Sequence, residues 1–122
     1  VGPTLTARYK VELKGRTLAT PGILAKAGVL TALTTDHWVV GVQYLPLTLI
    51  MAVKEGLPRD VALRLVTINS ARIMGVDDRL GSLAPGKDAD VVVWSGDPLD
   101  VYQRVEQVYV NGEKVYTYFR SE

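Results

Sequence analysis

Cysteine is absent from this sequence, and histidine occurs once, as His37. Without thiols the chain forms no disulfide, has no thiolate nucleophile and offers no cysteine ligand to a metal ion. The lack of disulfides is typical of a reducing compartment, and we predict a cytoplasmic location. A hydrolytic zinc site usually takes three protein ligands, so a single histidine also limits what this chain can bind by itself.

Long apolar runs are absent too. The longest one, residues 44–53, is too short to span a bilayer and is interrupted by Pro46 and Thr48. The first residues, Val1-Gly2-Pro3, lack the basic region and apolar run of a secretory signal, and they lack an initiator methionine. We therefore expect no membrane partner, and we expect the chain to begin partway through a longer gene product.

Neither sign of charge is in excess. Fourteen basic and thirteen acidic side chains give a formal net charge of +1, without a cluster of basic residues. Nucleic acids and anionic membranes require such a cluster, so both classes of partner are excluded. The aromatic residues of the C-terminal half are then expected to form cross-strand pairs, not a platform on which bases stack. They are Trp94, Tyr102, Tyr109, Tyr116, Tyr118 and Phe119.

What remains is an ordinary globular composition, with 48% hydrophobic residues in 122. Up to about residue 79 the pattern predicts short strands alternating with helices. A helix over residues 19–27 should end at Gly28, and residues 29–33 should form a strand buried on both faces. A helix over residues 45–55 is apolar nearly all round, which predicts burial on several sides. Another helix should start at Pro58, and Asn69 should be the N-cap of a helix over residues 70–74 that Gly75 ends.

Beyond residue 79 the pattern predicts β structure. Strands are expected over residues 90–94, 104–110 and 113–119. The last two flank Asn111-Gly112, which favours a type I′ hairpin because both residues accept a positive φ. The segment 81–87 has the spelling of a phosphate-binding loop, but Asp88 replaces the expected Ser or Thr and a strand follows. We therefore interpret it as a glycine-rich turn.

Asp36 and His37 follow the predicted strand 29–33 directly. In parallel α/β folds functional groups lie at the carboxyl ends of strands, and an aspartate there can bind a metal ion and take a proton from water. The other interpretation is a loop aspartate beside a surface histidine, and the spacing alone does not decide between them. If a metal site exists, most of its ligands must come from outside this chain.

Four segments read together as one pattern: residues 30–37, residues 56–75, residues 81–90 and residues 108–112. They resemble the C-terminal part of enzymes of the amidohydrolase superfamily, from the end of the eighth barrel strand to the closing β segment. Val1-Gly2-Pro3 with Lys10 and Glu12 resembles the loop after the seventh strand in the imidazolonepropionase-like branch. The resemblance covers nearly the whole chain, and residues 81–90 with the Asn-Gly hairpin are its most specific part.

The resemblance implies an α/β fold in two parts. Residues 1–79 would be the last two strand–helix units of a TIM (β/α)₈ barrel, and residues 80–122 would be strands of a small β-sandwich. Eight βα units need about 240 residues, so this chain would supply about two of them.

The resemblance also implies a metal-dependent hydrolase of C–N bonds in small, often cyclic, amides. Asp36 would be a metal ligand and the general base, His37 would contact the substrate, and the divalent metal would be zinc. The other metal ligands of the family, among them a His-x-His pair, have no counterpart here. The isolated chain should therefore be inactive, and its partners would be a small-molecule substrate and the missing N-terminal portion of the barrel.

The alternative is a non-catalytic interaction domain that oligomerises through exposed strand and helix surfaces. A strand over residues 29–33 with one neighbour, near Val1, leaves an open edge of unpaired N–H and C=O groups. Together with the apolar helix 45–55, this edge predicts a homo-oligomer or association with a complementary chain.

Overall fold

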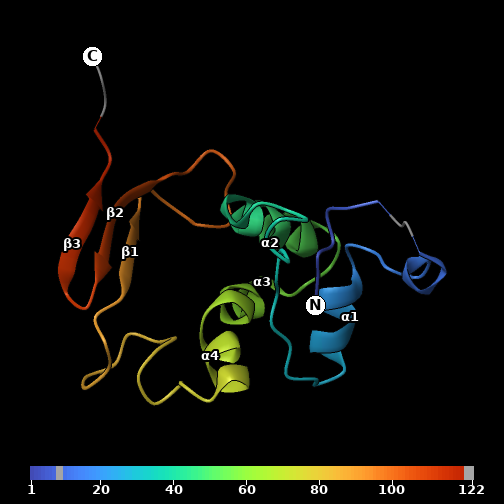
Figure 1. The fold of residues 1–122 in the computed structure, drawn as a ribbon, viewed down its shortest axis with the longest axis horizontal. Coiled ribbons are helices and arrows are strands. Elements are labelled where there is room, and N and C mark those ends of the chain that lie inside the picture. Colours follow the sequence, from blue (N-terminus) through green and yellow to red (C-terminus); the bar gives the residue numbers. More distant parts are fainter. Residues whose placement is uncertain (8–9, 120–122) are drawn as a thin grey trace.

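The computed structural model describes residues 1–7 and 10–119, with helices in the first part of the chain and a sheet in the last (Figure 1). The α-helices are α1 (Thr20–Lys26), α2 (Leu45–Lys54), α3 (Arg59–Ala62) and α4 (Ile68–Met74). Short 3₁₀ helices cover Val11–Leu13, Val42–Tyr44 and Leu63–Val66. The strands are β1 (Val91–Trp94), β2 (Val105–Val110) and β3 (Glu113–Thr117), which form one antiparallel sheet in the order β1-β2-β3. None of the helices within residues 1–7 and 10–119 has the length and apolar character needed to cross a bilayer.

The helices lie where the sequence pattern predicts them, although α4 begins two residues before the predicted start at Ser70. Helices α1 and α2 lie within the predicted ranges, and α3 begins directly after Pro58. Gly28 and Gly75, just beyond α1 and α4, have φ of 76° and 70°, the left-handed conformation that glycine adopts without steric cost. The α2 helix is nevertheless buried on one face only, at Thr48, Leu49 and Ala52. The prediction of burial on several sides is wrong, because side chains outside this face, such as Leu47 with 38% exposure, stay partly open to solvent.

Residues 29–33 are extended but belong to no strand in the described part of the chain, so the predicted strand is wrong. Leu33 is buried, while Val29 and Leu30 are each 50% exposed. A strand buried on both faces of a parallel sheet needs parallel neighbours on both sides and helices over both faces. Among the described residues up to residue 79 there is a single neighbour of this kind, at Val1. The same residues do not show the expected alternation of strands and helices.

The Val1 neighbour is bonded as a parallel strand would be. The Val1 nitrogen donates to the carbonyl oxygen of Ala32 at 2.6 Å, and the Thr34 N–H donates to the Val1 carbonyl oxygen at 2.9 Å. Bonds from one residue to both neighbours of the facing residue, here Leu33, are the parallel pattern. Gly2 packs so closely that a Cβ built there would lie 1.9 Å from the Thr34 carbonyl oxygen.

The second edge of the extended segment is bonded to helices, and the prediction that it stays open is wrong at these positions. Leu33 N–H donates to the Leu65 carbonyl oxygen at 3.0 Å, and Asn69 Nδ2 donates to the Thr31 carbonyl oxygen at 2.9 Å. Asn69 is therefore not an N-cap. It is the second residue of α4, and Thr67 is the N-cap. The side-chain amide of Asn69 bonds a distant carbonyl group and does not cap the helix.

The sheet forms as predicted, with slightly shorter strands. Asn111 and Gly112 have φ of 51° and 79°, as a type I′ turn requires, and join β2 to β3. Register shifts between Val93 and Trp94 and between Val108 and Tyr109 mark irregularities in both strand pairs. Residues 81–87 form turns before β1, and Lys87 Nζ donates to main-chain carbonyl oxygens of Asp77 and Leu80. The lysine thus ties the end of the turn to the segment that precedes it.

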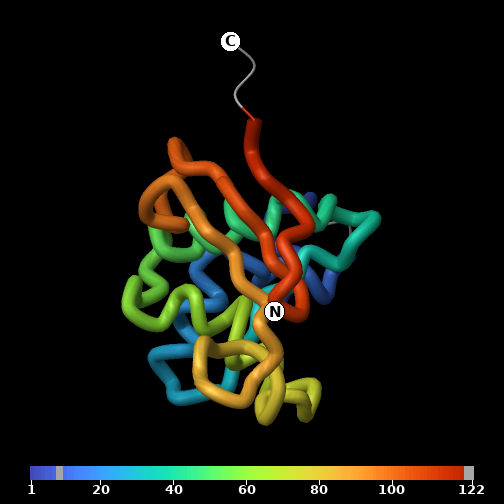
Figure 2. Tube along the Cα trace, turned by 90° about the vertical axis from the view of Figure 1, so that its left-hand side faces the viewer, coloured from blue at the N-terminus to red at the C-terminus, as the bar shows by residue number. Residues whose placement is uncertain are grey.

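The core joins the two halves of the chain. It consists of the buried residues Leu33, Leu49, Ala52, Leu57, Ala62, Leu65 and Leu99. Leu99 comes from the connection between β1 and β2, and two residues before it Asp97 forms an ion pair with Arg59 at the start of α3. In Figure 1 this connection lies beside α2, and Figure 2, turned by 90°, shows the sheet in front of the helices.

Candidate functional site

The candidate site is the loop that follows the extended segment. Because Leu33 has a parallel-type neighbour in Val1, Asp36 lies just beyond the carboxyl end of a strand-like pair. This is the end at which parallel α/β folds place functional groups. Asp36 and His37 directly follow this segment, to which the structure assigns no strand.

The backbone of Asp36 is held in a sparsely populated conformation. Its φ is 52°, a left-handed value that aspartate tolerates better than most residues. Its N–H donates to Thr34 Oγ1 at 3.2 Å, and its carbonyl oxygen accepts from the Val39 N–H at 2.8 Å. The side chain is exposed, and within residues 1–7 and 10–119 no hydrogen bond or ion pair engages the carboxylate. The carboxylate is therefore available to a ligand.

His37 is exposed, but its ring has two neighbours. Nδ1 accepts a hydrogen bond from the Val42 N–H at 3.2 Å, and the centroid of the ring lies 4.6 Å from that of the Trp38 ring, with the two planes tilted by 36°. Trp38 has a φ of 93° and is 91% exposed. Sequence reasoning passed over Trp38 and Val42. The signal for Trp38 was a large aromatic residue directly after the Asp-His pair; Val42 acts through its backbone and leaves no signal.

The described residues do not form a metal site by themselves. No group of three or more histidine, cysteine or acidic side chains gathers anywhere among them. Asp36 offers one carboxylate as an oxygen ligand, while His37 Nδ1 already accepts a hydrogen bond from the Val42 N–H. A hydrolytic metal ion therefore needs further ligands.

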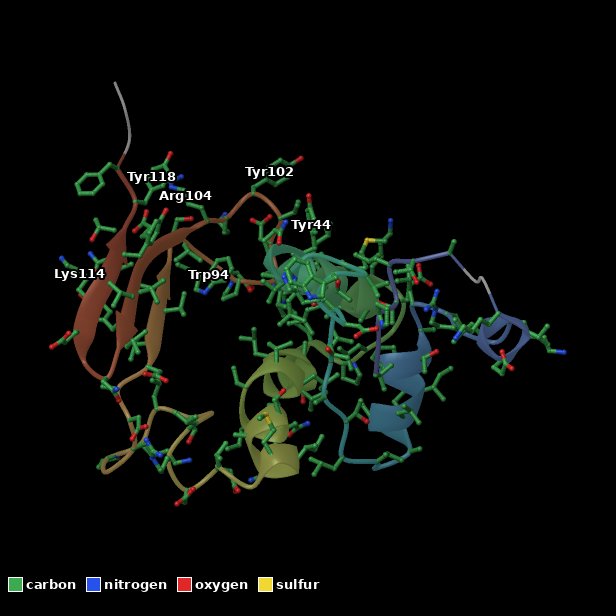
Figure 3. All side chains as sticks on the ribbon, in the orientation of Figure 1. Tyr44, Trp94, Tyr102, Arg104, Lys114 and Tyr118 are labelled. Carbon is green, nitrogen blue, oxygen red and sulfur yellow. The ribbon has the colours of Figure 1, made fainter. Side chains whose placement is uncertain are left out.

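The other residues that the sequence analysis considered make no contact that would add them to the Asp36–His37 site in the described part of the chain. Lys10 and Glu12 are exposed around the 3₁₀ helix Val11–Leu13. In Figure 3 Trp94, Arg104 and Tyr118 lie on the sheet half, where the Arg104 guanidinium carbon is 4.5 Å from the centroid of the Tyr118 ring. Arg104 directly precedes β2 and Tyr118 directly follows β3, and the guanidinium covers part of the ring face.

A groove of about 330 Å³ lies between α2 and the connection that joins β1 to β2. Leu47 and Ile50 of α2 line one wall, and Trp94 and Val101 line the other. Neither Asp36 nor His37 lines it. The groove is a junction between the two halves and adds nothing to the candidate site.

Two carboxyl groups with a lowered pKa lie outside the loop. The pKa of the Asp97 carboxyl is lowered, first by the hydrogen bond from the Leu99 N–H and then by Arg59. The pKa of Asp100 is lowered by hydrogen bonds from the Gln103 side chain and then the Tyr102 N–H. These carboxylates organise the connection between β1 and β2 and hold it to α3.

Comparison with known proteins identifies the family. Residues 3–116 match the amidohydrolase family. The chain is 35% identical over 104 residues to the amidohydrolase tasK of Hapsidospora irregularis, covering 85% of this chain and 11% of tasK. The chain also superposes on the crystal structure of an amidohydrolase from Thermotoga maritima MSB8 with a TM-score of 0.93 and 45% identity, covering 97% of this chain and 31% of the other.

A third relative carries a metal. The structure of an adenosine deaminase from Xanthomonas campestris with bound zinc matches with a TM-score of 0.62 and 26% identity, over 82% of this chain and 28% of that one. The chain thus spans about a third or less of the length of each of these proteins. The matches favour a hydrolase over a non-catalytic interaction domain. On the strength of the family match and the fold, this chain belongs to the amidohydrolase family.

Proposed function

We propose that this chain is the C-terminal part of a metal-dependent amidohydrolase. Residues 1–79 would form the last two strand–helix units of a TIM barrel, and residues 80–122 would form strands of a small β-sandwich. The parallel bonding of Val1 to both sides of Leu33 supports the first assignment. The partly exposed apolar side chains of the sheet, such as Val92 and Tyr116, support the second, since a sandwich would cover them.

The reaction is the hydrolysis of a carbon–nitrogen bond, other than a peptide bond, in a small amide or related substrate that is often cyclic. The names of the relatives support this class, because an amidohydrolase and a deaminase both break such bonds. When bound, the divalent metal, which we propose to be zinc, activates a water molecule for attack on the substrate carbon.

Asp36 has two roles in this proposal. One carboxylate oxygen serves as a metal ligand, and the carboxylate takes the proton that water gives up and passes it to the leaving nitrogen. His37, beside it on the same loop, contacts the substrate. The observation that carries the proposal is the exposed Asp36 carboxylate directly beyond a segment bonded as a parallel strand.

The remaining ligands would come from the N-terminal portion of the complete protein. The isolated chain should therefore neither hydrolyse amides nor hold zinc tightly, since one carboxylate and one partly engaged imidazole fall short of about three ligands. Isothermal titration of the purified chain with zinc tests this directly. Tight one-to-one binding would contradict the proposal.

A second experiment tests complementation. The separately produced N-terminal portion is mixed with this chain, and zinc content and amide hydrolysis are measured for the purified complex. We expect both to appear together with the wild-type chain, and zinc content or rate to fall sharply with Asp36→Asn. A complex that turns over equally well with either chain would remove Asp36 from the reaction.

A cytoplasmic location also remains part of the proposal.

A further inference from the structure

The imidazole of His37 is held by the main chain at one nitrogen. Nδ1 accepts the Val42 N–H at 3.2 Å, and a nitrogen that accepts a hydrogen bond carries no proton. In the neutral ring the proton must then lie on Nε2. The backbone of Val42, at the start of the 3₁₀ helix Val42–Tyr44, therefore selects one tautomer of His37.

The loop around His37 is strained on both sides. Asp36 and Trp38 are two of the three residues other than glycine that have a positive φ in the described part of the chain. For tryptophan this conformation is unfavourable, and with 91% of its surface exposed Trp38 gains little burial in return. Its indole packs against the His37 ring. The result is an imidazole with a fixed acceptor side and a fixed neighbour, beside an exposed carboxylate.

Neither nitrogen of this ring suits a metal ion. The Nδ1 lone pair faces the Val42 N–H. Coordination through Nε2 would use the lone pair there and move the proton to Nδ1, where two N–H groups would face each other. The group that the ring offers outward is thus a hydrogen-bond donor.

We propose that His37 is a specificity-determining residue that donates from Nε2 to the substrate, with Val42 as its positioning residue. This rests on the proposed function of the Asp36 site. The substrate class follows from this donor. The substrate must carry an acceptor lone pair next to the scissile C–N bond, on a carbonyl oxygen or on an unprotonated ring nitrogen. A compound that presents an N–H at that position is rejected, because two donors then face each other.

The tautomer can be measured on this chain without any activity. His37 is the only histidine, so a ¹⁵N-labelled sample gives a single set of imidazole signals. For the neutral ring, we expect a pyrrole-type shift at Nε2 and a pyridine-type shift at Nδ1. Proton occupancy of Nδ1 would overturn the proposal.

A matched pair of variants isolates the Val42 N–H. Val42→Pro removes it at the first residue of a helical turn, where proline is accepted, and Gly41 has φ −57° and ψ 139°, as a residue before proline requires. Val42→Ala trims the side chain and keeps the N–H. We expect averaged shifts of two exchanging tautomers in the proline variant and wild-type shifts in the alanine variant. Identical shifts in all three proteins would show that Val42 does not hold the ring.

Substrate recognition is tested in the complex with the N-terminal portion. His37→Gln keeps an N–H donor near the position of Nε2, while His37→Asn has its amide near Nδ1 only. We expect about tenfold loss of kcat/KM in the asparagine variant, mainly in KM, a smaller loss in the glutamine variant, and unchanged zinc content in both. Loss of zinc in the asparagine variant, or equal kcat/KM in both variants, would overturn the role of His37. Failure of Asp36→Asn to affect turnover would instead overturn the proposed function.

Discussion

The side-chain amide of Asn69 donates to the carbonyl oxygen of Thr31 at 2.9 Å, across 38 positions of the chain. Two residues further along, Leu33 N–H donates to the Leu65 carbonyl oxygen from the same edge of the extended segment. The opposite edge bonds to Val1. The segment that leads to Asp36 is thus held between the N-terminal residues on one side and the 3₁₀ helix Leu63–Val66 with α4 on the other.

Removal of the Asn69 amide should loosen this connection. Asn69→Ala leaves the partly buried Thr31 carbonyl group without its donor, and we expect the free energy of unfolding to fall by about 1–2 kcal/mol. Arg72→Ala, in the same helix, removes only an exposed ion pair at 3.8 Å and should cost much less. Urea denaturation of both variants is the measurement, and equal losses would show that the Asn69–Thr31 bond contributes nothing.

Leu65 should be among the most sensitive positions for packing. It is 1% exposed in the core, and Leu65→Ala should lower the free energy of unfolding by about 2–5 kcal/mol. Leu63, in the same 3₁₀ helix but 42% exposed, provides the control. Leu63→Ala should cost about 1 kcal/mol or less. A comparable loss in thermal denaturation of the two variants would contradict the burial seen here.

The Asp97 carboxylate should make stability depend on acid pH. Its folded-state pKa is lowered, so it stabilises the fold above the unfolded value of about 3.9, and that contribution is lost as the pH falls through the lower folded value. Asp97→Asn keeps an oxygen to accept the Leu99 N–H but loses the charge that pairs with Arg59. We expect a shallower loss of stability on acidification than in the wild type.

The acid limb is measured by urea denaturation at a series of pH values. Asp60→Asn, at an exposed carboxylate in the first turn of α3, serves as the control. An acid limb that is changed equally by both substitutions would mean that Asp97 has no special part in it.

Asp36→Asn should preserve the fold while it removes activity from the reassembled enzyme. Asparagine has the shape of aspartate and also tolerates a positive φ, so the strained loop should remain intact. The amide accepts no proton, and loss of a general base typically costs about 10²-fold or more in kcat. Circular dichroism of the chain and steady-state kinetics of the complex check the two parts. Near-normal turnover would show that another group takes the proton.

The isolated chain should associate with itself. Val92 and Tyr116 pair with Val108 from either side on one face of the sheet and are 48% and 45% exposed. Apolar faces of this kind favour association. Val92→Thr keeps a β-branched side chain with less apolar surface, and it should weaken association in sedimentation velocity at micromolar concentration. Val101→Thr, at an exposed valine outside the sheet, should not. A wild-type monomer would contradict the prediction.

The sequence by itself determined the local elements. Glycine at 28 and 75 ends helices because only a left-handed residue fits there, and Asn111-Gly112 fixes the hairpin because both residues accept a positive φ. The family was also readable, since its motifs lie in these turns and loops. Such features depend on residues near one another in the chain, so pattern and propensity are enough to place them.

Only the tertiary structure decided what surrounds residues 29–33. A run of apolar residues indicates that a segment is buried. Whether it forms a strand depends on the neighbours that pair with it, and the sequence pattern does not identify them. Here those neighbours are Val1 on one edge and Leu65 and Asn69 on the other. The bond from the Val42 backbone to His37 is equally invisible in the sequence, because every residue except proline carries the same N–H and only the folded loop brings this one to the ring.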